Sequence, residues 1–311
     1  MTMKIAITGG AGYIGSLLIK KLRDKNHILT SIDNQSIGDY KWLRATGVES
    51  LNVGDVKTIE DLIKTFKDAD CVAHLAALPG LTLCNEKPEE ACLTNIYGTH
   101  QILEAAKQAN IKRVVFCSTA AVYGTPQKTP VTEDHPLRPM NLYGVTKLAG
   151  EKLMEAYHAN DGLETVSLRF GNVYGVGLYT RWSTVVPKFV RLALENKPLT
   201  IYGDGTNSRD FVHVEDICQA LELALTQSGV GGEVYNVGCE PTTIQEIAEV
   251  VSDEAEKSIG NRPEITYLPP RAGETKEFTY DLSKIRDGLD FKPEWTIRKG
   301  VQQLIQYYKK S

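Results

Sequence analysis

The sequence lacks the charge pattern of proteins that bind nucleic acid or anionic membranes. Its formal net charge is -4, its pI is about 5.9, and no run of lysine and arginine is longer than a pair. A mildly acidic chain without basic clusters has no electrostatic attraction to polyanions. We therefore expect neither nucleic acid nor a membrane surface as a partner.

Long apolar runs and paired cysteines are also absent. No stretch approaches the roughly 20 apolar residues of a transmembrane helix, and the N-terminus has no signal-peptide pattern, so we expect a cytoplasmic protein. None of the six cysteines stands in a Cys-x-x-Cys pair. This favours buried free thiols, with no disulfide framework and no metal site.

Short apolar runs alternate with helical patterns through the first half of the chain. The expected strands are Lys4–Thr8, His27–Asp33, Ser50–Val53, Cys71–Ala76, Arg113–Ser118 and Glu164–Arg169. The expected helices are Tyr13–Lys25, Thr58–Lys67, Pro88–Ala109 and Leu142–Asn160. Such alternation predicts parallel strands joined by crossover helices, with both faces of the sheet covered. The fold class is therefore α/β, a doubly wound parallel sheet of the Rossmann type.

The pattern loosens after residue 175. Helices are expected at Thr184–Asn196, Val214–Leu225, Thr242–Lys257 and Ile297–Lys309, and short strands at Leu199–Tyr202 and Val234–Val237. With 311 residues, the chain can form one large or two modest domains. We expect residues 1–175 to form a nucleotide-binding Rossmann domain. Residues 176–311 should form mainly a smaller C-terminal α/β substrate-binding domain, with some segments returning to the first.

Glycines at positions 9, 12 and 15 follow the first expected strand and open the first expected helix. Glycines so placed allow a tight turn, a close approach of the backbone to a pyrophosphate, and packing of helix on strand. The helix N-terminus offers N–H groups and partial positive charge to phosphates. Asp33 ends the second strand, where its carboxylate can bind ribose hydroxyls and repel a 2′-phosphate. This favours NAD over NADP as the cofactor.

Tyr143 and Lys147 begin another expected helix, and their spacing places both side chains on one face. Tyrosine has an ordinary pKa of about 10, which is too high for a base at neutral pH. A nearby ammonium group stabilises the phenolate and so lowers that pKa. The hydroxyls of Ser118 and Thr119 stand at a strand end, where a substrate is expected. We interpret Tyr143 and Lys147 as an acid/base pair.

Together these features resemble the extended branch of the short-chain dehydrogenase/reductase superfamily. More narrowly, the chain resembles the NAD-dependent epimerase/dehydratase family, and within it most closely the UDP-glucose (UDP-galactose) 4-epimerases. The resemblance covers nearly the whole chain. Further matching segments are Asp55-Val56, His74–Ala77, Asn95, Phe116–Gly124, Arg169–Gly175, Arg209–Val214 and Arg271–Glu274.

The resemblance implies a role for each matching position. Thr119, Tyr143 and Lys147 would be the catalytic residues. The cofactor-binding residues would be Gly9, Gly12, Tyr13, Ile14, Gly15, Asp33, Asn34, Asp55, Val56, Leu75, Ala76, Ala77, Asn95, Ser118, Tyr143, Lys147 and Phe170. The substrate-binding residues would be Thr119, Asn172, Arg181, Arg209, Arg271 and Glu274. Of these, Arg209 and Arg271 would clamp the diphosphate, a role that suits the planar guanidinium group.

The resemblance also implies a reaction. Tyr143 would take the proton from the sugar C4 hydroxyl while NAD accepts the hydride, and the return of hydride to the other face of a 4-keto sugar would complete an epimerisation. The substrate would be a nucleotide sugar, and this resemblance implies a UDP-linked one. Pairing of the Pro88–Ala109 and Leu142–Asn160 helices with those of a second copy would give a homodimer.

Two departures from the 4-epimerase pattern leave alternatives open. Leu78-Pro79-Gly80 and Arg181 are closer to enzymes of UDP-glucuronate, where an arginine binds the carboxylate. Ala120-Ala121 follow Thr119 where 4,6-dehydratases have Asp-Glu, which argues against a dehydratase. An NAD-dependent nucleotide-sugar dehydrogenase or reductase is a further alternative. A non-catalytic NAD sensor would not need to keep Thr119, Tyr143 and Lys147 together.

Overall fold

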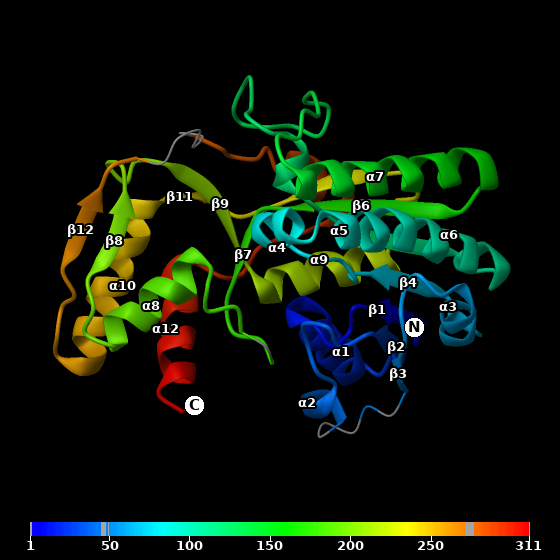
Figure 1. Cartoon of the computed structure of the whole chain (residues 1–311), viewed down its shortest axis with the longest axis horizontal. Helices are drawn as coiled ribbons and strands as arrows, with labels where there is room; N and C mark the ends of the chain where they lie inside the picture. Colours follow the sequence, from blue (N-terminus) through cyan, green and yellow to red (C-terminus); the bar gives the residue numbers. More distant parts are fainter. Residues whose placement is uncertain (1, 45–47, 49, 179, 271–276, 311) are drawn as a thin grey trace.

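Seven parallel strands form the central sheet of the computed structural model, which describes residues 2–44, 48, 50–178, 180–270 and 277–310 (Figure 1). In sheet order they are β10 (Val234–Val237), β6 (Glu164–Phe170), β5 (Arg113–Thr119), β4 (Cys71–His74), β1 (Lys4–Thr8), β2 (Ile28–Asp33) and β3 (Leu51–Val53). Every neighbouring pair is parallel. The strand order reverses between β1 and β4, which is where sheets of this kind bind ligands. The predicted fold class is confirmed.

Helices cover both faces of this sheet. One face packs against α1 (Tyr13–Asp24) and α9 (Val214–Thr226), the other against α3 (Ile59–Phe66), α6 (Gly98–Gln108) and α7 (Leu142–Asp161). Because side chains alternate along a strand, Ile5 and Ile7 of β1 enter the first core, and Ala6 enters the second. Burial on both sides explains why the strands read as continuous apolar runs.

The predicted helix Pro88–Ala109 is divided into three parts. It consists of α5 (Pro88–Cys92), a π-helical turn (Leu93–Tyr97) and α6. Asn95 lies on the π-helical turn and is 1% exposed. Such turns are frequent at functional sites because they redirect a side chain without ending the helix. Three short helices were not predicted: α2 (Lys41–Arg44), α4 (Leu81–Glu86) and α11 (Ser283–Leu289).

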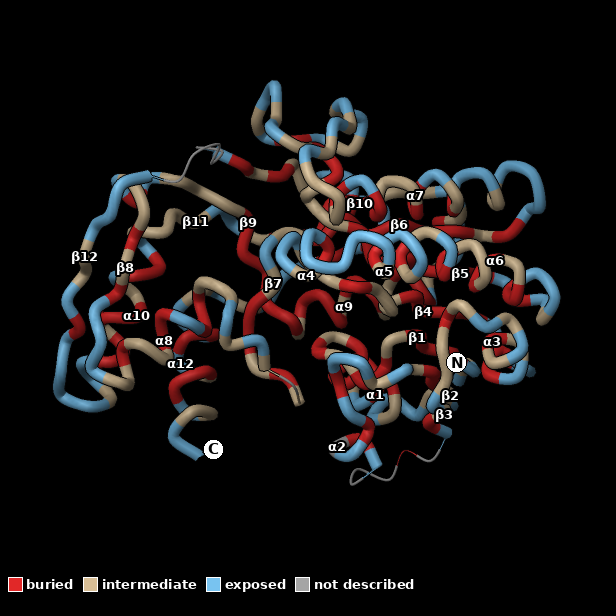
Figure 2. Tube along the Cα trace, viewed as in Figure 1, coloured by how far each residue is buried: buried red, intermediate tan, exposed pale blue. Residues whose placement is uncertain are grey.

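A second group of elements lies at the left of Figure 1. It contains the helices α8 (Val185–Leu194), α10 (Ile244–Ile259) and α12 (Ile297–Tyr308) and two small sheets. One sheet has the order β11 (Pro241–Thr243), β9 (Ser208–His213), β7 (Asn172–Tyr174), and the other pairs β12 (Ile265–Leu268) with β8 (Leu199–Tyr202). The facing sides of these elements are buried in Figure 2 and share one hydrophobic core. Strand β10 and helix α9 return from this half of the chain to the large sheet.

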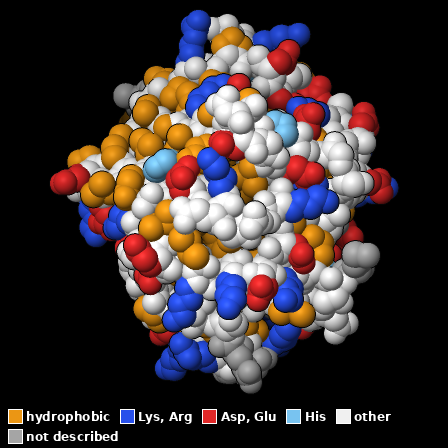
Figure 3. Space-filling model, turned by 90° about the vertical axis from the view of Figure 1, so that its right-hand side faces the viewer, with side chains coloured by type: hydrophobic (Ala, Val, Ile, Leu, Met, Phe, Trp, Pro, Cys, Tyr) orange, Lys and Arg blue, Asp and Glu red, His pale blue; other side chains and the backbone are white. Residues whose placement is uncertain are grey.

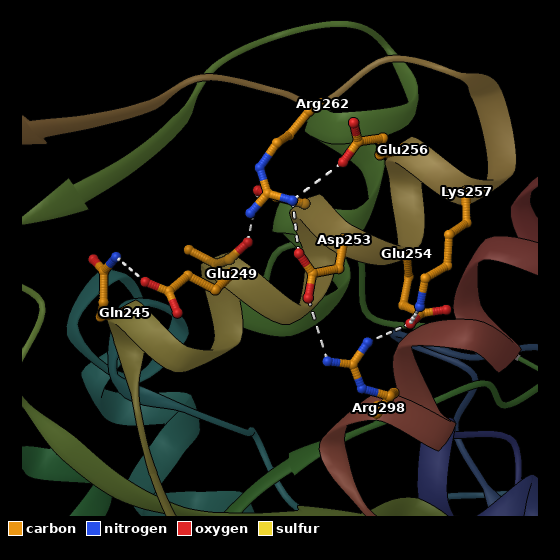
Figure 4. Close-up of polar contacts among 10 residues, drawn as sticks. Gln245, Glu249, Asp253, Glu254, Glu256, Lys257, Arg262 and Arg298 are labelled. Atoms are coloured by element: carbon orange, nitrogen blue, oxygen red, sulfur yellow. Dashed lines mark hydrogen bonds and ion pairs between the residues drawn. The ribbon is translucent and has the colours of Figure 1, made fainter.

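Ion pairs join α10 to α12 and to the segment that follows α10 (Figure 4). Arg298 contacts Glu254 and lies 3.3 Å from Asp253, which is also 2.6 Å from Arg262. The two arginine side chains are 44% and 46% exposed, so water screens the ion pairs that they make with Asp253. At the other end of α10, Thr243 and Glu246 form a capping box.

The helices that the structure describes include none that is both long and apolar enough to cross a lipid bilayer.

Candidate functional site

A cavity of about 1000 Å³ opens at the carboxyl ends of the central strands. It lies between the sheet and the smaller group of elements, where β7 and α8 form its other wall. The predicted site residues that line it are Gly9, Gly12, Tyr13, Ile14, Gly15, Asp33, Asn34, Val56, Leu75, Ala76, Ala77, Ser118, Thr119, Tyr143, Lys147, Phe170, Asn172, Arg181 and Arg209. Residues that lie far apart in the sequence thus share one cavity.

The glycine turn between β1 and α1 forms one end of the cavity. A Cβ atom on Gly15 would lie 2.2 Å from the carbonyl oxygen of Gly9, so no side chain fits there. Gly9 has a φ of 76°, and a Cβ atom on it would lie 2.6 Å from the backbone nitrogen of Ala76. Glycine is therefore required at both positions, and the backbone of the turn stays accessible to a ligand.

Asp33 is fixed at the end of β2 beside this turn. Its carboxylate accepts hydrogen bonds from the backbone N–H groups of Ala11, at 3.0 Å, and Gln35, at 2.6 Å. Burial raises the pKa of Asp33, and these two N–H groups oppose the rise. Asn34 donates to Asp55 at 3.3 Å, which places Asp55 beside the cavity although it does not line it.

Asn95 supports the cavity wall from behind. Its side chain accepts a hydrogen bond from the backbone nitrogen of Leu78 at 2.7 Å and donates to the carbonyl oxygen of Leu78 at 3.1 Å. It also donates to Thr146 of α7 at 3.0 Å. The amide therefore joins the segment after β4 to the turn of α7 between Tyr143 and Lys147.

Tyr143 faces Thr119 across the cavity floor. Asn141 caps the N-terminus of α7 by accepting a hydrogen bond from the N–H of Gly144 at 2.9 Å. A Cβ atom on Gly144 would lie 2.6 Å from the carbonyl oxygen of Ala121, so α7 begins close to the segment that follows Thr119. Burial raises the pKa of Tyr143 to about 12, whereas the charge of Arg181 and a hydrogen bond with Thr119 lower it. The hydroxyl is therefore protonated in the cofactor-free protein and needs further positive charge before it acts as a base.

Lys147 lies one helical turn further along α7 and is buried. Its ammonium nitrogen lies 4.3 Å from the centre of the Phe116 ring. Burial lowers the pKa of Lys147 to about 8, and nearby Cys117 and Glu151 oppose that fall. A lysine held in this way has little competing hydration and acts strongly on a neighbouring phenol or hydroxyl.

A third residue of the same α7 face, Glu151, was missed from the sequence. It accepts a hydrogen bond from Ser118 and lies 2.7 Å from Arg169 of β6, and both charged side chains are only 4% exposed. Arg169 also donates a hydrogen bond to the hydroxyl oxygen of Tyr123 at 2.7 Å. The i, i+4, i+8 spacing of Tyr143, Lys147 and Glu151 was a signal for this shared face, but the partner on β6 was not visible in the sequence.

Arginines line the opposite wall. Arg181 and Arg209, both predicted, are joined there by Arg191 of α8, which the sequence did not indicate because its neighbours form an apolar helix face. The Nε atom of Arg191 is buried and makes no hydrogen bond with the described residues. Guanidinium groups around a cavity favour an anionic ligand such as a diphosphate. Arg271 and Glu274 lie outside the described residues.

The arrangement fits NAD at one end and an anionic substrate at the other. The glycine turn, the N-terminus of α1 and the carboxylate of Asp33 are the groups that a dinucleotide requires. Thr119, Tyr143 and Lys147 lie where the two ends meet. This geometry suits proton transfer coupled to hydride transfer at a hydroxyl-bearing carbon.

Comparisons with known proteins agree with this geometry. Residues 5–238 match the model of the NAD dependent epimerase/dehydratase family. A UDP-glucose 4-epimerase from Corynebacterium glutamicum is 31% identical over 94% of this chain and 92% of its own length. The structure of a UDP-N-acetylglucosamine 4-epimerase from Methanobrevibacter ruminantium is 32% identical, with a TM-score of 0.90 over 99% of both chains. MoeE5, solved with NAD and either UDP-glucose or UDP-glucuronic acid, is 32% identical with a TM-score of 0.84 over 99% of both chains.

Proposed function

Because this chain belongs to the NAD-dependent epimerase/dehydratase family and NAD is its cofactor, we propose that it is a nucleotide-sugar 4-epimerase that interconverts UDP-glucose and UDP-galactose. The observation that carries the proposal is the meeting of Thr119, Tyr143 and Lys147 between a dinucleotide cradle and an arginine-lined wall. Ala120 and Ala121 follow Thr119, so the acid that water elimination requires is missing at that position. This favours an epimerase over a dehydratase.

The glycine turn and Asp33 would hold NAD, which would supply a reversible hydride acceptor for a sugar carbon. Tyr143 removes the proton from the C4 hydroxyl of the sugar, and Thr119 hydrogen-bonds to both. In this proposal Lys147 adds its positive charge to that of Arg181, which lowers the pKa of Tyr143. Arg209 and Arg191 hold the diphosphate while the 4-keto sugar turns over and presents its other face. Tyr143 then returns the proton, so the reaction is an isomerisation with no net oxidation.

A uronate is the second candidate sugar, and one observation favours it. Arg181 reaches across the cavity, where its Nη2 atom lies 3.8 Å from the position that a Cβ atom on Gly80 would take. MoeE5 has been solved with UDP-glucuronic acid. A guanidinium near Tyr143 and Gly80 suits a carboxylate on the sugar C5 atom. If Arg181→Ala leaves turnover of UDP-glucuronate intact, this candidate is wrong.

The test is incubation of the protein with a panel of UDP-, dTDP- and GDP-sugars, followed by separation of the products. We expect UDP-galactose to form from UDP-glucose without steady accumulation of NADH. Accumulation of NADH would instead indicate a net dehydrogenase. Tyr143→Phe should lose most turnover and still bind NAD, and near-wild-type turnover by that variant would contradict the assignment.

We also propose a homodimer formed through α5, α6 and α7. The side chains of Leu81 in the neighbouring α4, Leu93 and Tyr97 in the π-helical turn between α5 and α6, and Val145 in α7 are 44–50% exposed. Helices α4, α5 and α6 lie at the front of Figure 1. Figure 3 is turned by 90°, so this front face lies at its left, and hydrophobic side chains gather there. Such a concentration is typical of a protein interface. Analytical ultracentrifugation should give a dimer for the wild type and more monomer for Tyr97→Asp.

A further inference from the structure

The hydroxyl of Tyr13 joins the cofactor cradle to the segment that leads to Arg181. Tyr13 is the first residue of α1 and its side chain is buried. Its hydroxyl donates a hydrogen bond of 2.7 Å to the carbonyl oxygen of Gly175, which lies 162 residues further along the chain. The family resemblance places Tyr13 along the cofactor pyrophosphate, but the hydroxyl itself is used on the other side of the cavity.

The segment Gly175–Leu178 fits closely against the Tyr13 ring. A Cβ atom on Gly177 would lie 2.7 Å from Cδ2 and 2.8 Å from Cε2 of Tyr13. The ring therefore occupies the space that a side chain at position 177 would take. On the opposite side, a Cβ atom on Gly175 would lie 2.3 Å from Nε2 of His213. The backbone is thus held between an aromatic ring of the cradle and a histidine of β9.

Helix α12 holds the same segment from the substrate side. Gln303 of α12 accepts hydrogen bonds from the backbone nitrogen of Val176 at 3.2 Å and from Nε2 of His213 at 3.0 Å. His213 can donate from Nε2 because its Nδ1 accepts the N–H of Glu215. The hydrogen bond from Tyr13 ties Gly175 to α1, and Lys21 of α1 contacts Glu215 at the other side of this assembly.

Arg181 follows this segment and points back into the cavity. Burial raises the pKa of both Tyr13 and Tyr143, and the positive charge of Arg181 opposes the rise at each of them. The guanidinium group is therefore close to the cradle and to the acid/base residue at once. Nearby, the ring of Trp182 packs on those of Tyr307 and Tyr308 in α12. A shift of the segment would move Arg181 relative to Tyr143.

We propose that Tyr13 is a positioning residue whose hydroxyl holds Gly175–Leu178 on the cofactor cradle and so sets where Arg181 meets the sugar nucleotide. The proposal rests on the proposed function for the identity of that ligand. It goes beyond that function in linking the two halves of the cavity. Tyr13 would act through the backbone of Gly175 and Arg181, without touching the reacting atoms.

The test uses Tyr13→Phe, which removes the hydroxyl and keeps the ring. Hydrogen exchange of the NAD-loaded protein, followed by mass spectrometry, reports on residues 175–186. We expect exchange there to become about two- to tenfold faster, as for the loss of one net hydrogen bond. The KM for the nucleotide sugar should rise by a similar factor, while the affinity for NADH changes less. Gly177→Ala, whose Cβ atom must displace the ring, should speed exchange in the same peptides.

Tyr40→Phe is the matched control. Tyr40 is also buried beside the cradle, and its hydroxyl hydrogen-bonds to Ser31 at 2.9 Å and not to the 175–186 segment. Unchanged exchange at 175–186 in Tyr13→Phe, or an equal change in Tyr40→Phe, would overturn the proposal. The exchange is measured without substrate, so it decides about Tyr13 even if no UDP-sugar is turned over. Absence of turnover of every UDP-sugar by the wild-type protein would count against the proposed function and would leave the exchange result for Tyr13 standing.

Discussion

Removal of the charge on Glu151 should strongly destabilise the protein. Its carboxylate and the guanidinium of Arg169 are both only 4% exposed, and they are joined by hydrogen bonds of 3.0, 3.2 and 2.7 Å. In Glu151→Gln the guanidinium remains buried without its counter-ion. Breaking a buried pair by removing one partner costs roughly 3–5 kcal/mol, which is a large part of the stability of a typical domain.

A double-mutant cycle isolates the interaction between the two side chains. The free energy of unfolding is measured by urea denaturation, followed by circular dichroism, for Glu151→Gln, Arg169→Met and the combined variant. In the combined variant neither residue is charged, so we expect it to be more stable than the sum of the single changes predicts, by about 1–3 kcal/mol. Arg262→Met, which breaks exposed pairs with Asp253 and Glu256, serves as the control and should change the free energy of unfolding far less.

Additivity of the two single changes to within about 0.5 kcal/mol would refute this reasoning. The pair would then lie in surroundings polar enough to solvate each charge alone. Because Glu151 also accepts the hydroxyl of Ser118, Glu151→Gln should in addition lower kcat by disturbing how α7 lies on β5.

Three further predictions concern the site and its surroundings. Lys147→Met removes an ammonium group that favours the phenolate of Tyr143, so kcat should fall by roughly 100-fold. The rising limb of the plot of kcat against pH should also move to higher pH, which steady-state kinetics from pH 6 to 10 would show. Burial raises the pKa of Asp210 to about 7. Between the ordinary pKa of an aspartate and pH 7, the folded protein therefore holds a proton on Asp210 that the unfolded chain has lost. The free energy of unfolding falls as pH rises through that range. Asp210→Asn should lack this contribution, and its melting temperature relative to wild type should be higher at pH 8 than at pH 5; a difference independent of pH would contradict the assignment. Gly15→Ala places a Cβ atom 2.2 Å from the carbonyl oxygen of Gly9, so fluorescence titration should show a loss of NADH binding of at least about tenfold with an unchanged circular dichroism spectrum.

The sequence predicted the features that depend on short segments. The order of β1, turn and α1 follows from an apolar run, three glycines and an amphipathic helix, so the cradle and Asp33 could be placed without a structure. The face shared by Tyr143 and Lys147 follows from helical periodicity alone. Strand bounds such as those of β1 and β8 agree with the prediction because turn residues mark their ends.

The prediction of secondary structure from the sequence was wrong or incomplete where the hydrophobic periodicity of a segment is interrupted or too short to read. Strand β9 (Ser208–His213) was recognised only as a matching motif, because buried Asp210 and His213 obscure its alternation. The single helix expected at Pro88–Ala109 contains a π-helical turn that ends just before Gly98, and the helical periodicity shifts there by one residue. Helix α4 (Leu81–Glu86) has only 6 residues, fewer than two turns, which is too short for a periodicity signal.

The sequence by itself therefore determined the fold class, the glycine turn, the shared helix face of Tyr143 and Lys147 and the family resemblance, since each depends on neighbouring residues or on ordered motifs. Tertiary structure alone decided the partners of those residues. The hydrogen bond from Tyr13 to Gly175, the ion pair of Glu151 with Arg169 and the place of Arg191 on the cavity wall all join segments that are distant in the sequence. Burial and pairing arise only when those segments pack together, and burial is what shifts the pKa of Lys147 and Tyr143.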